Sequence, residues 1–230
     1  MKSHILILTV AAFAITAPAW GGSTVSSYSG DVGFINTPPD SLVPGADEND
    51  LKALLFMEDT NLVFASAITV DATAPGLYQS KASLTPGSIA AGTLISDTYL
   101  HADPVTSGTT FTGSVTFSSD ILGVIATSSD LVATDPLLGV SGTTYGSIHD
   151  APGLELSPSQ DYFSISPDLR TLTFSVKTWN FTDDLRVITA GSLTATAGAQ
   201  SAVPEPGTIP LIALGLGLIA IGVRRHRSTR

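Results

Sequence analysis

The stretch from Thr110 to Ser118 constrains the fold more than any other part of the sequence. Phe111, Val115 and Phe117 alternate there with threonine and serine. A period of two places apolar side chains on one face of a β-strand and hydroxyl groups on the other. The stretch therefore predicts a strand with one buried face and one solvated face, as in an antiparallel sheet.

Short apolar runs separated by turn residues repeat this signal along the chain. Leu172, Phe174 and Val176 form a second stripe of period two. Further strands are expected at Asp31 to Ile35, Ala53 to Glu58, Leu62 to Val70, Leu77 to Leu84, Ile121 to Ile125, Tyr162 to Ile165, Thr171 to Lys177 and Leu185 to Ala190. Asp59-Thr60-Asn61 is expected to be a hairpin turn, and Ser129 to Leu138 a short helical turn. This spacing predicts an all-β domain in residues 51–200, a single antiparallel, jelly-roll-like β-sandwich of about eight to ten strands.

The N-terminus has the pattern of an export signal. Lys2 precedes an apolar stretch from Ile5 to Thr16, and Ala17-Pro18-Ala19 is a typical cleavage site. Residues 1–19 are therefore predicted to be a signal peptide, and the alternative is an uncleaved anchor. Residues 20–50, rich in glycine, serine and proline, are predicted to be a linker or edge region.

The C-terminus has three consecutive parts. Pro204-Glu205-Pro206 should be extended and accessible, because proline neither continues a helix nor donates to a sheet. Residues 209–223 are apolar and predict a single transmembrane helix, which would cover about 22 Å of a hydrocarbon core of roughly 30 Å. Residues 224–230 form a basic end that should stay cytoplasmic. Its anchoring charges are Arg224, Arg225 and Arg227.

In this order, residues 203–230 resemble the PEP-CTERM sorting signal of exported proteins of Gram-negative bacteria. The resemblance implies transient anchoring in the inner membrane and processing near Pro204 by exosortase, a membrane transpeptidase. It also implies a final location at the cell surface or outside the cell. The alternative is a plain C-terminal anchor that is never cleaved. Stretches such as VDATAPGLY and FTGSVTFSSDILGVI also resemble the folded region of one group of PEP-CTERM proteins, a resemblance that implies no particular activity.

The region between the two end segments is strongly acidic, which excludes one class of partner. Residues 20–203 contain nineteen Asp and Glu against five Lys and Arg, a net charge of −14. Because nucleic acid binding requires a basic surface, we expect no nucleic-acid partner. The absence of cysteine excludes disulfides and thiolate metal sites.

Candidate metal ligands are few and scattered along the sequence. His101 near Asp103, and His149 beside Asp150, offer His/carboxylate pairs, but no second ligand motif accompanies either. We therefore expect no metal and no cofactor, with calcium as the alternative. The calcium alternatives are the acidic run Asp47-Glu48-Asn49-Asp50 and the strand-end carboxylates Asp71, Asp120 and Asp161.

No motif in the sequence predicts catalysis. Nucleophile elbows, phosphate-binding loops and H-E-x-x-H are all missing. The adjacent pairs Glu58-Asp59 and Asp183-Asp184 should point to opposite faces of a strand, so neither is expected to form a glycosidase pair. We therefore expect a non-enzymatic protein of the cell surface or the extracellular matrix.

Carbohydrate binding is the alternative function. Trp179-Asn180, between two predicted strands, offers a flat ring beside an amide, which is typical of sugar sites on β-sandwiches. Trp179 could equally cap the core at an edge of the sandwich. Tyr99 and Tyr145 are weaker candidates. The expected ligand is an exopolysaccharide, such as that of a biofilm.

Overall fold

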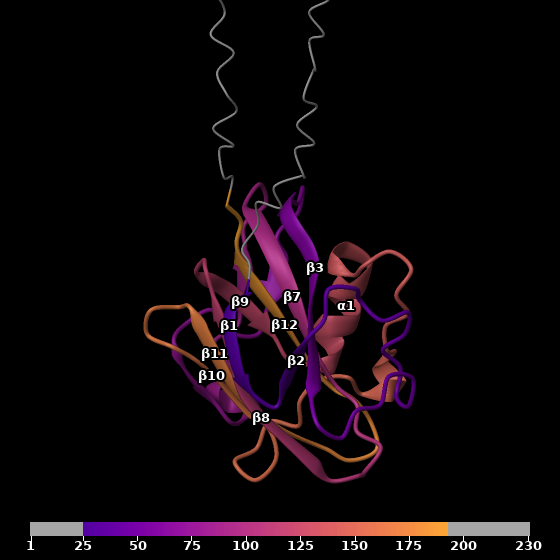
Figure 1. Ribbon diagram of the computed structural model, residues 1–230. Coiled ribbons are helices and arrows are strands. Elements are labelled where there is room, and N and C mark those ends of the chain that lie inside the picture. Colours follow the sequence, from indigo (N-terminus) through magenta and orange to yellow (C-terminus); the bar gives the residue numbers. More distant parts are fainter. Residues whose placement is uncertain (1–24, 193–230) are drawn as a thin grey trace, which may run out of the picture. The chain divides into compact units, whose positions relative to one another are not determined.

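The computed structural model describes residues 25–192, which form twelve strands, one α-helix and two 3₁₀ helices (Figure 1). The strands are β1 (Val25–Gly30), β2 (Val32–Phe34), β3 (Ala53–Val63), β4 (Ile68–Val70), β5 (Gly76–Tyr78), β6 (Gly87–Ile89), β7 (Leu94–Ala102), β8 (Thr109–Phe117), β9 (Ile121–Ile125), β10 (Tyr162–Ile165), β11 (Thr171–Thr178) and β12 (Asp183–Ala190). The helices are α1 (Ser128–Leu138), η1 (Lys81–Ser83) and η2 (Ile148–Asp150). This content confirms the all-β class.

Ten of these strands form two five-stranded sheets. The order is β1-β8-β11-β10-β5 in the first sheet and β2-β3-β7-β12-β9 in the second, and β4 and β6 form a small separate pair. Neighbouring strands run antiparallel, except that β2 pairs with β3 in parallel. The predicted antiparallel arrangement is therefore correct for every strand pair of the described residues except this one.

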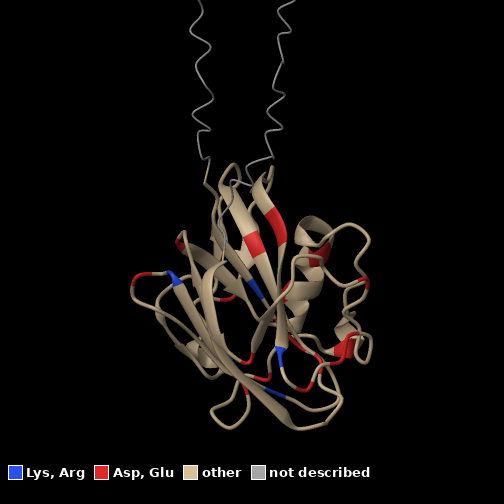
Figure 2. Cartoon of the chain, viewed as in Figure 1, with Lys and Arg blue, Asp and Glu red and all other residues tan. Residues whose placement is uncertain are grey.

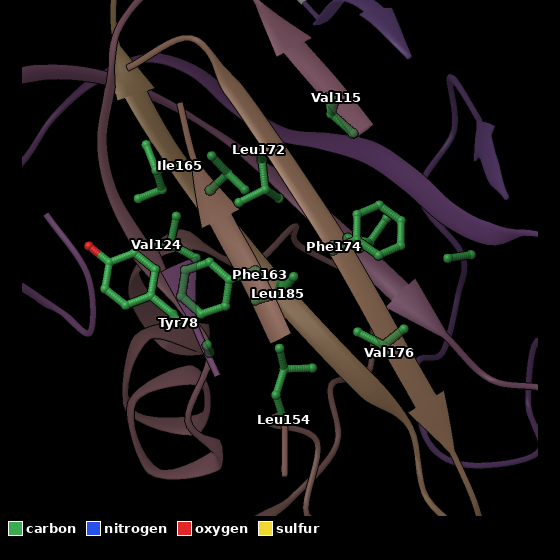
Figure 3. Packing of buried hydrophobic residues seen from close by; sticks show 14 of the residues in the cluster. Tyr78, Val115, Val124, Leu154, Phe163, Ile165, Leu172, Phe174, Val176 and Leu185 are labelled. Carbon is green, nitrogen blue, oxygen red and sulfur yellow. The ribbon is translucent and has the colours of Figure 1, made fainter. Parts of the chain in front are cut away.

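The main hydrophobic core lies between the two sheets. Phe111, Val115 and Phe117 of β8 are at most 1% exposed, and so are Leu172, Phe174 and Val176 of β11. These side chains share one cluster with residues of the second sheet, among them Leu185 (Figure 3). The prediction that both period-two stripes face one interior is confirmed.

A second apolar cluster lies on the other face of the second sheet, beneath α1. Tyr99 of β7 and Ile188 of β12 pack there with Leu131 and Leu138 of the helix. In Figure 1, α1 lies beside β3 and β7, on the side away from β10 and β11. β7 and β12 are therefore buried on both faces, since every residue of β7 from Ile95 and every residue of β12 up to Thr189 is buried.

The predicted hairpin at Asp59-Thr60-Asn61 is wrong. β3 continues through these residues to Val63 and stays paired with β7, with register shifts between Met57 and Asp59 and between Asp59 and Leu62. Asn61 takes a φ of 56°, in the left-handed region that asparagine tolerates better than most residues. The turn-forming residues thus form bulges in one long strand instead of a turn.

Three other boundaries differ from the sequence prediction. The expected strand from Leu62 to Val70 is divided between the end of β3 at Val63 and β4, which begins at Ile68. The expected strand from Leu77 to Leu84 ends at Tyr78, and its second half contains η1, which Ser80 caps by accepting the backbone N–H of Ser83. The predicted N-terminal linker contains β1, which pairs with β8. β1 is thus an edge strand of the first sheet.

No helix within residues 25–192 is long and apolar enough to cross a membrane. The predicted signal peptide, residues 1–19, and the predicted membrane helix, residues 209–223, lie outside the described residues.

Replacing Phe117 with aspartate should unfold the domain. The substitution removes an aromatic side chain that is 1% exposed and places a carboxylate in its apolar site. Loss of a buried Phe costs about 3–5 kcal/mol before the buried charge is counted, against a typical total stability of about 5–15 kcal/mol. Thermal unfolding measures the effect. Thr110→Asp, exposed on the same strand and opposite Lys177, is the matched control and should leave the melting temperature nearly unchanged. If Phe117→Asp kept the melting temperature of the wild type, the assignment of this face of β8 to the core would be wrong.

Candidate functional site

The loop between β11 and β12 exposes two aromatic side chains. Trp179 and Phe181 are each 48% exposed, with the exposed Asn180 between them. The flanking residues Thr178 and Thr182 are buried, so the loop is fixed at both ends. Apolar rings that the core leaves half exposed are typical of binding surfaces.

The neighbouring loop between β7 and β8 holds this aromatic loop in place. A side chain at Gly108 would come within 3.2 Å of the Trp179 ring, so glycine permits the close approach there. The hydroxyl of Ser107 donates to Oδ1 of Asn180 at 3.5 Å. The Lys177 ammonium lies 4.5 Å from the centre of the Trp179 ring. A cation–π contact of this exposed kind is worth about 0.5–1 kcal/mol, so a ligand that stacks on the ring could displace the lysine.

Hollows flank the aromatic loop on both sides, and Trp179, Asn180 and Phe181 line both of them. The first hollow, of about 190 Å³, is completed by Glu155, Gln160 and Asp183. The second, of about 320 Å³, is completed by Pro44, Gly45, Glu48, Asp103, Pro104, Val105 and Ser107. Both hollows combine aromatic rings with amide and carboxylate groups, the mixture that ligand sites use for orientation.

Three carboxylates converge beside the first hollow, which two of them, Glu155 and Asp183, line directly. Glu155, Asp161 and Asp183 each place a carboxylate oxygen within 4.8 Å of the other two. Asp161 is fixed by two backbone donors, the N–H of Glu155 at 2.7 Å and the N–H of Lys177 at 2.8 Å. Sequence reasoning identified Asp161 as a strand-end ligand but not Glu155 or Asp183, because the three residues come from separate segments of the chain.

Burial changes the proton affinity of all three carboxyl groups. Burial and the charge of Asp161 raise the pKa of Asp183 well above its usual range. Burial also raises the pKa of Asp161, although the hydrogen bonds from Lys177 and Glu155 oppose the rise. Burial and the neighbouring Asp161 raise the pKa of Glu155, against smaller opposing effects of a backbone hydrogen bond at Glu155 and of the charge of Lys81. The cluster therefore carries excess negative charge that is unfavourable without a proton or a cation.

The two histidines of the described residues lie elsewhere. His101 is buried, and its Nδ1 lies 2.8 Å from Oδ1 of Asp184. Burial lowers the pKa of His101, but the charge of Asp184, the hydrogen bond to it and the charges of Asp103 and Asp47 together raise the pKa above its usual value. His149 is exposed on η2, where Asp150 accepts hydrogen bonds from Ser147. Neither histidine belongs to a group of three potential metal ligands within residues 25–192.

Most of the other calcium alternatives already have protein partners. Asp50 accepts the N–H and hydroxyl of Thr106, at 2.8 and 2.9 Å. Asp71 accepts the N–H groups of Ala126 and Thr127, both at 2.8 Å, at the start of α1. The ion pair of Asp120 is with Arg170, at 3.1 Å. Among the described residues, only Asp161 of the sequence candidates belongs to a group of converging carboxylates.

Tyr99 is wrong as a sugar-binding candidate, and the partly buried Tyr145 packs beside it and not in either hollow. Tyr99 is 1% exposed and donates a hydrogen bond to Asp184, while Tyr145 donates to Glu58. Both rings pack around the guanidinium of Arg186, whose centre lies 5.0 Å from the Tyr99 ring and 5.6 Å from the Tyr145 ring. They belong to the packing of α1 against the second sheet.

Arg186 is the centre of a buried ionic network that the sequence did not indicate. It is 0% exposed, and its Nε and Nη2 donate to the two oxygens of Glu58 at 2.6 and 2.8 Å. The guanidinium also donates to two residues of α1, to Asp135 at 3.0 Å and to Thr134 at 2.7 Å. The network therefore joins β3 and β12 to the helix.

The adjacent carboxylates diverge, as their positions in the sequence predict. Asp184 is directed toward His101 and Tyr99, whereas Asp183 lines the first hollow. Glu58 pairs with Arg186, and Asp59 has no ion pair in the described part of the chain. Neither pair has the facing arrangement that a glycosidase requires.

The family comparison concerns the C-terminal segment. Residues 202–227 match the PEP-CTERM protein-sorting motif. This match confirms the resemblance drawn from Pro204-Glu205-Pro206, the apolar run and the arginines, so the chain carries a PEP-CTERM sorting signal. Such a signal implies export and membrane-associated processing by exosortase-type machinery before placement at the surface. Searches of curated proteins and of solved structures gave no match.

Proposed function

We propose that this chain is a non-enzymatic protein of the cell surface or the extracellular matrix. Residues 1–19 serve as a signal peptide and residues 209–223 as a transient transmembrane helix, with Arg224, Arg225 and Arg227 on the cytoplasmic side. Exosortase-type machinery recognises Pro204-Glu205-Pro206 and removes the tail, which releases a jelly-roll-like β-sandwich outside the inner membrane. The observation that carries the proposal is the sorting motif at residues 202–227.

The intact mass of the protein recovered from outside the cell tests this route. The mature protein should lack residues 1–19 and the segment that follows the Pro204-Glu205-Pro206 tripeptide. An extracellular protein of full-length mass would contradict the proposed processing at both ends.

A second function, carbohydrate binding, is favoured by the aromatic loop. Trp179 and Phe181 offer half-exposed rings on either side of Asn180, and both adjacent hollows contain carboxylates. Sugars bind such surfaces by stacking their C–H faces on rings while amides and carboxylates accept their hydroxyl protons. Acidic positions outnumber basic ones over the described domain (Figure 2), so a neutral polysaccharide fits better than an anionic one. The proposed ligand is therefore a neutral exopolysaccharide.

A glycan array of recombinant residues 20–203 should show binding that depends on Trp179. Trp179→Ala removes the exposed ring, and loss of such an aromatic anchor should weaken binding at least about tenfold, which corresponds to about 1.4 kcal/mol. Tyr28→Ala is the matched control, because Tyr28 is 49% exposed but lies on β1 and does not line either hollow. Unchanged melting temperatures would show that both variants fold. Equal binding by wild type and Trp179→Ala would exclude this loop as the sugar site.

A further inference from the structure

In the described domain, buried carboxylates without a cationic partner lie beside the first hollow, a feature that sugar binding does not require. Asp161 is 0% exposed and Asp183 is 3% exposed, and a carboxylate oxygen of the exposed Glu155 lies within 4.8 Å of theirs. Within residues 25–192, none of the three forms an ion pair with lysine, arginine or histidine. The nearby Lys177 ammonium lies over the Trp179 ring. Buried carboxylates without a cationic partner are rare because desolvation of the charge is costly.

Asp183 provides an independent sign that a ligand is missing from this cluster. Its Oδ2 atom is buried and has no hydrogen-bond partner at normal distance and angle in the described part of the protein. The hydroxyl of the neighbouring Thr178, which lowers the pKa of Asp183, has no such partner either. Asp183 also lines the hollow, so its side chain borders open space next to Glu155. A buried acceptor with no donor is unfavourable because its desolvation is not compensated, and more so when the acceptor is charged. A group that binds in the hollow and contacts this oxygen would remove the cost.

The composition of the site favours a hard cation. Its charged ligands are oxygens, and Gln160, which lines the same hollow, carries a further amide oxygen. Each oxygen of Asp161 accepts a backbone hydrogen bond but keeps a second lone pair for a ligand. Calcium takes six to eight oxygen ligands in flexible geometry and often keeps water, whereas zinc prefers nitrogen and sulfur ligands. A hollow of about 190 Å³ has room for the ion and several water molecules.

We propose that Glu155, Asp161 and Asp183 bind one divalent cation, preferentially Ca²⁺, at the hollow beside Trp179. The ion joins the loop at Glu155, the start of β10 and the start of β12, and so stabilises the part of the domain that carries the aromatic loop. This site differs from the acidic run Asp47 to Asp50, in which the Asp50 carboxylate accepts hydrogen bonds from Thr106. The proposal does not depend on sugar binding.

Calcium titration of the full chain in mild detergent tests the site. Isothermal titration calorimetry should give one binding event for Ca²⁺ and at least tenfold weaker binding for Mg²⁺, which requires stricter octahedral geometry. At a calcium concentration 100 times the Kd, the melting temperature should rise by about 5–10 °C. Tb³⁺, a luminescent substitute for Ca²⁺, should emit when tryptophan is excited, because Trp179 lines the same hollow.

Asp183→Asn separates cation binding from a structural role of the cluster. The amide keeps the shape of the side chain and removes the unpaired charge, so the variant should fold and, without calcium, melt no lower than the wild type. It should lose calcium affinity at least tenfold, together with the rise in melting temperature and the Tb³⁺ emission. Asp47→Asn makes the same chemical change in the acidic run and should retain all three. The absence of calcium binding by the wild type at millimolar concentration, or an equal calcium response of Asp183→Asn, would overturn the proposal.

Discussion

Replacing Arg186 with methionine should lower the free energy of unfolding of the domain by about 3–5 kcal/mol. Methionine fills much of the volume of the arginine stem but leaves Glu58 and Asp135 without their cation, beneath a helix that the guanidinium joins to the second sheet. Removal of one partner from a buried ion pair is costly because the remaining charge stays desolvated. In a domain of this size the loss corresponds to a fall in melting temperature of about 10 °C, which calorimetry or circular dichroism would measure.

Two further variants show whether the loss arises from the unpaired charge. Adding Glu58→Gln to Arg186→Met removes the main carboxylate as well, so the double variant should recover part of the stability. Arg170→Met is the matched surface control. Arg170 pairs with Asp120 at 3.1 Å, but both side chains are about half exposed, and such pairs contribute about 0–1 kcal/mol. If Arg186→Met and Arg170→Met lowered the free energy of unfolding equally, burial would not explain how much the Arg186 network contributes to stability.

The loss of stability caused by Arg186→Met should also depend on pH. Burial raises the pKa of Asp135 to about 6, although the charge of Arg186 opposes this rise. Because this folded-state pKa lies above that of an unfolded aspartate, about 3.9, Asp135 reduces stability as pH rises from about 4 to about 6. Without Arg186 the pKa should rise further, and below it the carboxyl is protonated and neutral. Arg186→Met should therefore lose less stability, relative to wild type, at pH 5 than at pH 8.

The sequence predicted the strands that are buried on one face, but of the two strands buried on both faces it predicted only Leu185 to Ala190 of β12 and not β7. β8 and β11 alternate because one face packs in the core and the other is more exposed, so their period of two was visible. β7 and β12 lie between the main core and α1, and their almost continuous burial removes this alternation. Polar residues such as Asp97 and Arg186 within these strands resemble solvent-facing positions in the sequence. Their true environment depends on α1, which packs over them only in the folded chain.

The sequence predicted the part of the candidate site whose residues are neighbours in the chain. It did not predict the part whose residues are distant in the chain and meet only in the fold. Trp179 and Asn180 are neighbours between two strands, so the sequence indicated an exposed ring beside an amide. The cation site combines Glu155, Asp161 and Asp183, and the last of these follows the first by 28 positions. Only the antiparallel pairing of β11 with β10 brings the end of β11, and Asp183 at the start of β12, back to Asp161. The sequence did predict that Asp183 and Asp184 point to opposite faces of their strand. In the structure Asp184 contacts His101, and Asp183 lines the hollow.

The C-terminal signal allows a sharper test, because two of its parts should fail in different ways when changed. Replacing Arg224, Arg225 and Arg227 with glutamine removes the charge that holds the tail on the cytoplasmic side. An apolar run of about 22 Å is short for a bilayer core of roughly 30 Å, so it has little further hydrophobic energy to fix its orientation. We expect this variant to be mislocalised, with most of it lost from the membrane fraction.

Glu205→Gln changes the Pro204-Glu205-Pro206 tripeptide and leaves the apolar run and the arginines intact, so this variant should stay in the membrane and remain unprocessed. Thr208→Ala, between the tripeptide and the run, is the control and should be processed as wild type. Fractionation of the native host locates each protein, and intact mass shows whether residues 209–230 have been removed. If wild type keeps these residues at the cell surface, or if Glu205→Gln is processed normally, the tripeptide is not the element that the processing enzyme recognises. A tail that stays attached in every variant would act as a permanent anchor, because the same apolar run and arginines suffice to hold a protein in the membrane without any cleavage.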